Sequence, residues 1–449
     1  MAAHWLIQRL REQGDGTALI WQGLNWSFDR LADAVEQQSG RLADENVAPG
    51  TVLAVRGDYS PGVVALLLAA IINRNILIPI ASSAAARQER MLEVAEAELL
   101  ADFCADDTWN LITCGHSASH ELLRELVDNN EAGLILFSSG STGESKASVL
   151  SFDRLLDKFQ TKRTGFRTLV FLLLDHIGGI NTLFHALCNG GTIVTAGDRR
   201  PEAVATAIAA HRVQLLPTTP TFLNMLMISE AGSRHDLSSL EIITYGTEPM
   251  PQTTLSAMAE AMPSVRLKQT YGLSELGIVP TQSRQSNSVW LKLGTAGFEH
   301  RIVDGILWIR SACAMLGYLN APVPFDAEGW FNTQDLVETD GEYVRILGRR
   351  SELINVGGEK VHPAEIENVL LQLDNVRDVT VSGRPNPVTG AVVGARITPI
   401  RDEDPDAFKR RIRRFCRDRL EAYKVPMVIE ITDADHHGAR FKKSRSLTS

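Results

Sequence analysis

The residues best suited to chemistry form a short loop from Ser138 to Lys146, with the sequence SSGSTGESK. An apolar run, Leu134–Phe137, leads into the loop and predicts a strand. Glycines allow close approach of the backbone to a ligand, hydroxyl groups donate hydrogen bonds, and Lys146 adds a positive charge. Together these groups suit a polyphosphate, although a flexible linker has a similar composition. The candidate phosphate-binding residues are Ser138, Ser139, Gly140, Ser141, Thr142, Gly143 and Lys146.

The loop does not have the spacing of a Walker P-loop, which requires GxxxxGK[ST] running into a helix. Ser145, not glycine, stands five residues after Gly140. Ala147–Leu150 reads as a second short strand, and a helix is expected only from about Ser151. The sequence therefore argues against a kinase or GTPase of the P-loop type.

Five further segments follow the loop, each with residues that could serve a ligand. Carboxylates such as Glu275 and Asp335 suit a hard cation or the hydroxyl groups of a sugar. Each segment alone could be an ordinary turn. In chain order they are YGTEP (Tyr245–Pro249), YGLSE (Tyr271–Glu275), GWFNTQD (Gly329–Asp335), GRRSELINVGGEK (Gly348–Lys360) followed by PAEIE, and AYKVP (Ala422–Pro426).

This ordered set resembles the signature of the adenylate-forming superfamily, which contains acyl-CoA synthetases, nonribosomal peptide synthetase adenylation domains and beetle luciferases. The resemblance implies that the loop binds ATP phosphates and that Glu275, with Thr142, holds Mg²⁺. It implies that Asp335 accepts hydrogen bonds from the ribose and that Arg349 contacts phosphate or ribose. The remaining implied ATP-site residues are Gly246, Thr247 and Glu248 near adenine, with Tyr271 and Ser274.

The carboxyl-terminal motifs depart from the family pattern in places. Ser351 stands at the implied interdomain hinge, where the family usually has Asp or Lys. In the last element, alignment on Arg445 puts Lys442 at the catalytic lysine and Phe441 where glycine is usual, with Lys443 as the alternative lysine. The resemblance assigns Gly357, Gly358 and Lys360 to the path of a thiol acceptor.

The pattern of elements predicts an α/β fold. From about residue 50, short β-rich runs, including Leu169–Leu174, alternate with helical stretches and predict stacked layers. A β-rich lobe should follow Gly272. We expect an adenylation core over residues 1–350 and a small, mobile α+β domain over 351–449 that carries the catalytic lysine.

The net charge, the cysteine content and the length of the apolar runs limit the classes of partner that the chain could bind. The formal charge is −9, which argues against nucleic acid as a partner. Five scattered cysteines favour a reducing cytoplasm, and no apolar run is long enough for integral membrane association. The basic run FKRRIRRFCRDRL could contact nucleic acid or lipid, but Phe408, Ile412 and Cys416 at helical spacing favour a helix with a solvated face.

One segment, DHIGGINTLFHALCNGG, limits the class of carboxylic acid that could be the substrate. The position at which amino-acid-activating relatives carry an aspartate falls on Ile177, so an α-amine would lack its partner there. Asp175 could point the same way if the segment is a strand. By resemblance, His176 lies beside the substrate carboxylate, although an isolated histidine is as often a hydrogen-bonded core residue.

These observations predict an AMP-forming acid–thiol ligase that uses ATP, Mg²⁺ and coenzyme A on a carboxylic acid without an α-amine. Lys442, His176 and Glu275 are the expected catalytic residues. One alternative is a stand-alone adenylation enzyme that loads the phosphopantetheine of an acyl carrier protein. Another is a nucleotide-binding regulator without catalysis, which the departures at Ser351 and Phe441 would suit.

Overall fold

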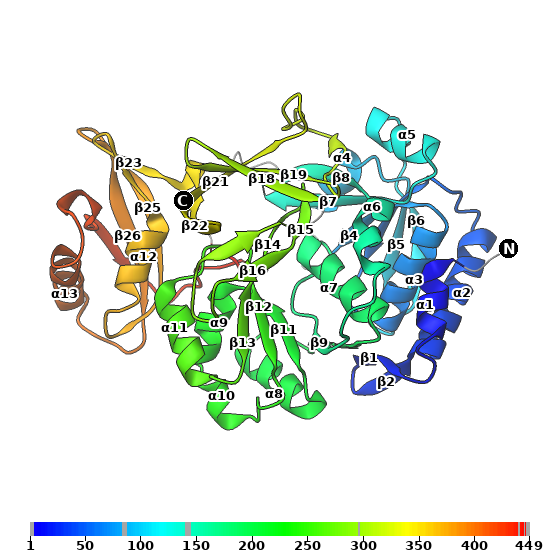
Figure 1. Cartoon of the computed structure of the whole chain (residues 1–449), viewed down its shortest axis with the longest axis horizontal. Helices are drawn as coiled ribbons and strands as arrows, with labels where there is room; N and C mark the ends of the chain where they lie inside the picture. The colour runs from blue at the N-terminus through cyan, green and yellow to red at the C-terminus, as the bar shows by residue number, and fades with distance from the viewer. Residues whose placement is uncertain are drawn as a thin grey trace.

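Two large sheets with helices between and outside them make up most of the molecule, and a smaller lobe follows at the carboxyl-terminal side (Figure 1). This computed structural model describes residues 4–82, 88–139, 145–294, 297–438, 441–443 and 445. We call the part up to Arg349 the large lobe and the part from Ile354 the small lobe.

The first sheet has the order β13-β12-β11-β9-β10-β1-β2, and every strand is parallel to its neighbour except β2. Its strands are β1 (Thr17–Trp21), β2 (Leu24–Ser27), β9 (Arg167–Leu169), β10 (Thr192–Val194), β11 (Leu215–Thr218), β12 (Ile242–Tyr245) and β13 (Arg266–Gln269). The predicted strand Leu169–Leu174 was wrong beyond its first residue. The chain leaves the sheet after Leu169 and forms a buried connection to the next helix, which an apolar run alone cannot distinguish from a strand.

The second sheet has the order β20-β8-β7-β4-β3-β5-β6. Its strands are β3 (Val52–Arg56), β4 (Ile76–Ile80), β5 (Leu99–Phe103), β6 (Trp109–Thr113), β7 (Gly133–Ser139), β8 (Ser145–Ser151) and β20 (Gly317–Tyr318). Alternate residues of β3 divide between two cores: Leu53 and Val55 face the helices between the sheets, and Val52 and Ala54 face the opposite side.

The helices form layers against these sheets. Between the sheets lie α1 (Trp5–Arg11), α2 (Phe28–Asp44), α3 (Pro61–Ile72) and α7 (Ile177–Cys188). Beyond the first sheet lie α8 (Pro201–His211), α9 (Pro220–Ile228), α10 (Ala231–Arg234) and α11 (Gln252–Ala261). Beyond the second sheet lie α4 (Gln88–Val94) and α5 (Glu121–Asp128), while α6 (Phe152–Leu156) follows β8. The stacked α/β architecture predicted from the sequence is confirmed.

A third, antiparallel sheet completes the large lobe, with the order β16-β17-β22-β21-β19-β18. Its strands are β16 (Thr281–Ser283), β17 (Leu291–Leu293), β18 (Phe298–Val303), β19 (Ile306–Ser311), β21 (Phe331–Asp340) and β22 (Tyr343–Arg349). A two-stranded hairpin, β14 (Tyr271–Leu273) and β15 (Gly277–Val279), packs against α7. Leu291, Leu307 and Val344 join the core between the two large sheets, which ties this β-rich part to the layers.

The small lobe has a hydrophobic core of its own, on which the proposed division near residue 350 rests. Its elements are β23 (Ile354–Val356), β24 (Glu359–Val361), α12 (Pro363–Leu370), β25 (Val376–Asn386), β26 (Gly390–Pro399), α13 (Pro405–Arg417) and β27 (Val428–Ile431). The basic helix α13 buries Phe408, Ile412 and Cys416, so its apolar face is used within the lobe, as its helical spacing predicted. Among the described residues, no helix has both the length and the apolar character needed to cross a membrane.

Candidate active site

The stems of the phosphate-loop candidate are the ends of the β7–β8 hairpin. Ser138 pairs with Lys146 across this hairpin, and Ser139 ends β7. Gly140, Ser141, Thr142 and Gly143 lie outside the described residues. The hairpin places the Lys146 ammonium 5.1 Å from the centre of the Tyr318 ring on β20, a favourable cation–π arrangement.

Tyr318 also holds Glu275, the predicted metal ligand. Its hydroxyl donates a 2.7 Å hydrogen bond to Glu275 Oε1 in the turn between β14 and β15. Burial, followed by the Glu275 charge, raises the pKa of Tyr318, so the phenol stays a donor at neutral pH. Tyr318 could not be predicted from the sequence, because this residue stands in no recognised motif.

Asp335 forms the centre of a second cluster. Its Oδ2 accepts a 2.5 Å hydrogen bond from the Tyr271 hydroxyl, and its Oδ1 lies 3.5 Å from Arg349 Nε. Asp335 is only 6% exposed. Burial raises its pKa, and Arg349 and Tyr271 oppose that shift. The three predicted residues are therefore brought together, with Tyr271 fixing the orientation of the carboxylate.

Gly246 and Thr247 follow β12 and form a closely packed corner. A side chain at Gly246 would come within 2.6 Å of Thr270 Oγ1, so only glycine fits there without a shift. Thr247 has φ +74°. Its hydroxyl is buried without a hydrogen-bond partner among the described residues. An unpaired buried hydroxyl next to a glycine suits contact with a polar ligand such as a nucleotide.

Glu248 contacts protein groups on two sides. Its Oε1 accepts hydrogen bonds from the Thr221 backbone N–H (2.8 Å) and hydroxyl (2.5 Å) on α9. Its Oε2 accepts one from the backbone N–H of Lys443 at 3.0 Å. Glu248, predicted to lie near adenine, thus links the large lobe to the carboxyl-terminal segment.

The two candidate lysines point in different directions. Lys443 Nζ donates to the Val379 carbonyl at 2.8 Å and lies 3.4 Å from Asp378, and its side chain is 8% exposed. Lys442 is exposed, and its ammonium forms no hydrogen bond or ion pair within the described part of the chain. The geometry therefore favours Lys442 as the lysine that is available to a ligand.

Lys442 lies close enough to the Asp335 cluster for their charges to interact. Desolvation, then the charge of Arg349, lowers the pKa of Lys442, whereas Glu352, Glu248 and Asp335 act in the opposite direction. Lys442 therefore lies within electrostatic range of the Arg349–Asp335 ion pair.

His176 is the N-cap of α7. Its Nδ1 accepts a 3.0 Å hydrogen bond from the Gly178 backbone N–H, which leaves Nε2 as the donor in the neutral ring. Because α7 packs against the β14–β15 hairpin, His176 lies at the end of the helix that supports Glu275. The predicted place of His176 beside a substrate carboxylate remains a prediction.

Asp175 and Ile177 do not lie on a strand, contrary to the possibility that the sequence left open. Residues 170–176 are not a strand, so alternation does not relate the two side chains. Ile177 begins α7 and is 2% exposed in the central core. Asp175 is buried, and its charge, with that of Asp58, opposes the effect of burial on the pKa of Arg199. Asp175 therefore already has a positively charged group within electrostatic reach.

The proposed thiol-binding residues lie elsewhere. Gly357 and Gly358 form the exposed turn between β23 and β24, where both have positive φ, and Lys360 is exposed beside them. In Figure 1, β23 lies at the outer end of the small lobe, far from β14 and β15. Ser351 lies in an exposed 3₁₀ turn, Arg350–Glu352, at the junction of the lobes.

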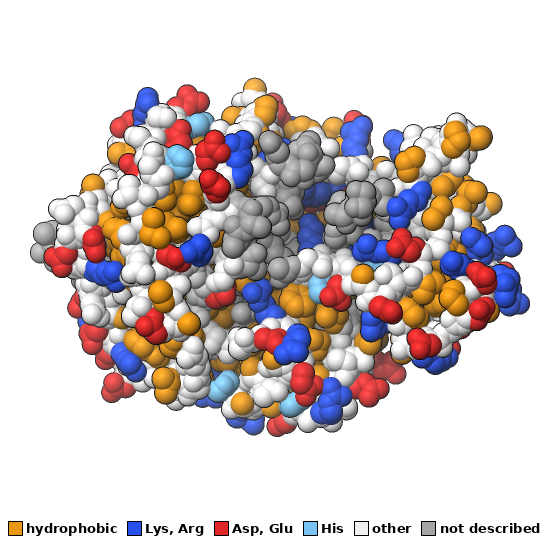
Figure 2. All heavy atoms as spheres, turned by 180° about the vertical axis from the view of Figure 1, so that it is seen from behind, with side chains coloured by type: hydrophobic (Ala, Val, Ile, Leu, Met, Phe, Trp, Pro, Cys, Tyr) orange, Lys and Arg blue, Asp and Glu red, His pale blue; other side chains and the backbone are white. Residues whose placement is uncertain are grey.

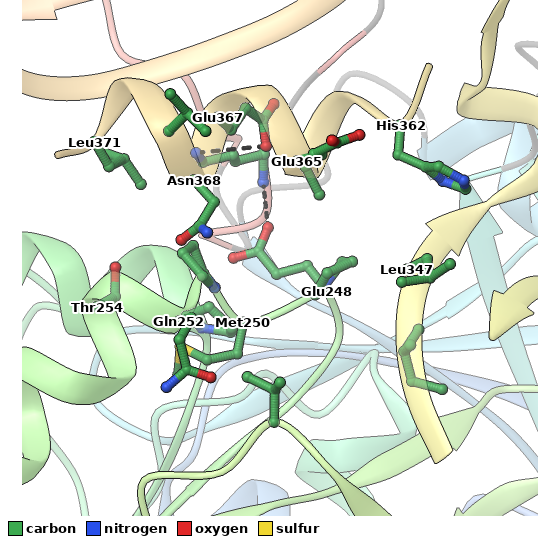
Figure 3. A pocket seen from close by; sticks show the side chains of 18 of the residues that line it. Glu248, Met250, Gln252, Thr254, Leu347, His362, Glu365, Glu367, Asn368 and Leu371 are labelled. Atoms are coloured by element: carbon green, nitrogen blue, oxygen red, sulfur yellow. Dashed lines mark hydrogen bonds and ion pairs between the residues drawn. The ribbon is translucent and has the colours of Figure 1, made fainter. Parts of the chain in front are cut away.

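A cavity of about 510 Å³ lies between the lobes, next to Lys443 and Arg445. In Figure 3, Glu248 extends from the large lobe toward α12, where Glu367, Glu365 and Asn368 line the opposite wall. The cavity does not include Glu275, Asp335 or Arg349, so we do not assign it to the nucleotide. Figure 2 shows a separate hollow near the centre of the rear face, with Lys or Arg side chains at its base.

Comparison with known proteins assigns the family. A family model described as AMP-binding enzyme matches residues 6–319, and one for the AMP-binding enzyme C-terminal domain matches residues 365–442. The chain belongs to the AMP-binding enzyme family. The predicted membership of the adenylate-forming group is confirmed.

Individual relatives are acyl- and aryl-CoA ligases. The chain is 27% identical to 2-succinylbenzoate–CoA ligase of Bacillus pumilus, covering 98% of this chain and 96% of the relative. It is also 27% identical to indoleacetate–CoA ligase of Aromatoleum aromaticum, covering 96% and 94%. Among solved structures, the anthranilate CoA ligase AuaEII with anthranoyl-AMP superimposes with a TM-score of 0.82 at 20% identity, covering 98% of this chain and 95% of that chain. This structural likeness confirms the fold.

Proposed function

We propose that the chain is an AMP-forming acid–thiol ligase that activates a carboxylic acid as its acyl-adenylate and then transfers the acyl group to a thiol. The observation that carries the proposal is the cluster of Tyr271, Asp335 and Arg349 in a chain that belongs to the AMP-binding enzyme family, with the exposed Lys442 within electrostatic range of that cluster. CoA ligases among the relatives, matched over nearly their whole length, support the same reaction class.

In the first step, a carboxylate oxygen of the acid attacks the α-phosphorus of ATP, and the bond to pyrophosphate breaks. Asp335 accepts hydrogen bonds from the ribose, and Tyr271 keeps its carboxylate in position. Lys442 and Arg349 stabilise the negative charge that develops on the phosphoryl oxygens. Such prepositioned charges act most strongly where water is partly excluded. Nε2–H of His176 donates to the acid.

Glu275 would hold Mg²⁺, which when bound would neutralise part of the charge of the ATP phosphates. Glu275 suits this task because Tyr318 engages only its Oε1. Among the described residues no group of three or more His, Cys, Asp or Glu side chains could hold a metal. A cation carried mainly by phosphates and one carboxylate agrees with the usual way that Mg²⁺ is bound. Thr142 would add a hydroxyl.

The acid is proposed to lack an α-amine. Ile177, at the position that the resemblance gives to the aspartate of amino-acid-activating relatives, is apolar and buried, so a substrate ammonium would lack that partner. The acceptor is proposed to be coenzyme A, reached through Gly357, Gly358 and Lys360 after the small lobe turns about Ser351. The five free cysteines support a reducing cytoplasm as its location.

The test is exchange of labelled pyrophosphate into ATP, screened over fatty, aryl and amino acids. Exchange with a fatty or aryl acid, followed by thioester formation with CoA, is the expected result. Exchange with amino acids alone would refute the substrate class. A product formed only on a carrier protein would favour the carrier-loading alternative. Nucleotide binding with no acid-dependent exchange would favour a regulator.

Asp335→Asn is expected to weaken the binding of AMP by about 10- to 100-fold, because a hydrogen bond to a charged group contributes about 1.5–3 kcal/mol. Isothermal titration calorimetry with AMP measures this change. Asp340→Asn, at the exposed end of the same strand, is the matched control and should bind normally. The raised pKa of Asp335 predicts that wild-type affinity falls on acidification at a higher pH than an ordinary carboxyl would cause. Unchanged affinity in Asp335→Asn would remove Asp335 from the nucleotide site.

A further inference from the structure

Phe441 occupies the position where the resemblance places glycine, and its backbone has the conformation that glycine favours. Its φ is +50°, in the left-handed region that disfavours side chains. A phenylalanine retained in such a conformation must be compensated by contacts of its ring or backbone. The structure supplies both kinds of contact.

The Phe441 ring packs on the large lobe. Its centroid lies 5.2 Å from that of Phe171 and 5.8 Å from that of Phe222, the latter edge-to-face. Both partners belong to the core between the first sheet and its outer helices. His437 stacks on Phe441 at 4.9 Å. An aromatic side chain from the carboxyl-terminal segment is thereby inserted against the other lobe.

The backbone on both sides of Lys442 is tied to the large lobe as well. The Thr219 hydroxyl donates to the Phe441 carbonyl at 2.8 Å. The Lys443 N–H donates to Glu248 at 3.0 Å. The backbone is therefore hydrogen-bonded to the large lobe on both sides of Lys442. Phe441, whose ring packs on that lobe, immediately precedes Lys442 in the sequence.

The side chains of Lys443 and Arg445, which follow Lys442, contact the small lobe instead. Lys443 contacts the Val379 carbonyl and Asp378. Arg445 forms a two-bond ion pair with Glu367 of α12, at 3.1 and 2.7 Å. The segment thus bridges the lobes, with Lys442 exposed between its attachments.

We propose that Phe441 is a positioning residue for adenylation: its ring anchors the carboxyl-terminal segment to the Phe171–Phe222 surface and so holds Lys442 at the site. This inference rests on the proposed function. Because the anchor must leave that surface when the small lobe turns, it favours acyl-adenylate formation and opposes the transfer step. A glycine at this position would provide the backbone geometry without the anchor.

Three substitutions test the anchor. Phe441→Ala and Phe441→Gly remove the ring, and Phe441→Gly also relieves the left-handed backbone. Both should lower acid-dependent pyrophosphate exchange by roughly 10- to 100-fold, the scale expected when a catalytic group is misplaced by about an ångström. Phe441→Leu keeps an apolar group and should stay within about threefold of the wild type. Val388→Ala, at an exposed residue of the small lobe, is the control.

Two further measurements separate positioning from a general structural role. Thioester formation from supplied acyl-adenylate should be unchanged or faster in Phe441→Gly. Hydrogen exchange at the Lys443 amide should rise, with an unchanged melting temperature. Wild-type exchange in Phe441→Gly, or equal losses in both half-reactions, would overturn the inference. Absence of exchange with any acid in the wild type would instead refute the proposed function.

Discussion

Lys442→Ala is expected to reduce acid-dependent pyrophosphate exchange by roughly 100- to 1,000-fold, the loss typical of removing one preorganised group that stabilises developing charge. The side chain is exposed between the lobes, and its charge interacts with those of Arg349 and Asp335. Removing it takes away positive charge where the α-phosphate would sit but leaves the packing of the segment intact. Thioester formation from supplied acyl-adenylate should persist, because in the proposed mechanism the small lobe turns away before this step.

Lys443→Ala provides the comparison. Lys443 is buried and hydrogen-bonded to the Val379 carbonyl, so its loss should lower the stability of the small lobe more than it lowers the chemical rate. Thermal unfolding and pyrophosphate exchange, measured on both variants, distinguish the two roles. If Lys443→Ala loses exchange while Lys442→Ala keeps it, the assignment must be reversed.

Glu367→Gln is expected to destabilise the small lobe by about 3 kcal/mol, the low end of the cost of breaking a buried ion pair. Glu367 is 2% exposed and accepts hydrogen bonds from Arg445 and from the Val381 N–H. The substitution leaves Arg445 and Lys443 buried with fewer negative charges near them. Asp378 and Glu352 remain as partial partners, which keeps the cost at the low end.

The pH dependence of this contribution has a definite sign. Burial by itself would raise the pKa of Glu367, but Arg445 and Lys443 reverse the effect and lower it from 4.5 to about 2. A carboxyl with a lowered pKa stabilises the fold above its unfolded value and loses that contribution as the pH falls through the folded value. The difference between wild type and Glu367→Gln should therefore be full above about pH 5 and shrink between about 4.5 and 2.

Urea unfolding at pH 7, 4 and 3 measures this difference. Glu365→Gln is the matched control on the same helix, since Glu365 is partly exposed and pairs with Lys424 at 2.7 Å. An ion pair of that kind should contribute no more than about 1 kcal/mol. Equal stability of Glu367→Gln and wild type at pH 7 would show that the buried pair contributes nothing.

Most of the architecture followed from sequence because hydrophobic spacing and local caps agree. Helix α3 begins with Pro61 after Ser60, whose hydroxyl accepts from the Val63 N–H, and its apolar run is buried on all sides. The failure at Leu169–Leu174 has a tertiary cause. The run is apolar because its residues divide between two cores, although only Leu169 among them pairs within the sheet.

The site was predictable where motifs carry charged or glycine residues and unpredictable where it depends on contacts between distant segments. Asp335 and Arg349 stand in motifs, and they are neighbours on β21 and β22. Tyr318 and Phe441 could not be assigned, since their roles depend on a hydrogen bond to Glu275 and on a ring surface in another lobe. The choice between Lys442 and Lys443 likewise required knowing which side of the segment faces Glu367.

In the carboxyl-terminal segment, neighbouring side chains point to different parts of the molecule, so the exact position of each residue matters for function. Lys443 and Arg445 bind the small lobe, whereas Lys442, which precedes both, is exposed at the opening between the lobes. A substitution changes one of these contacts, whereas a one-residue insertion between Phe441 and Lys442 would move Lys442 into the place of Lys443, beside Val379 and Asp378. Lys443 and Arg445 would at the same time lose their positions beside Asp378 and Glu367. The number of residues between Phe441 and Arg445, and not only their types, therefore determines which lysine can reach a ligand.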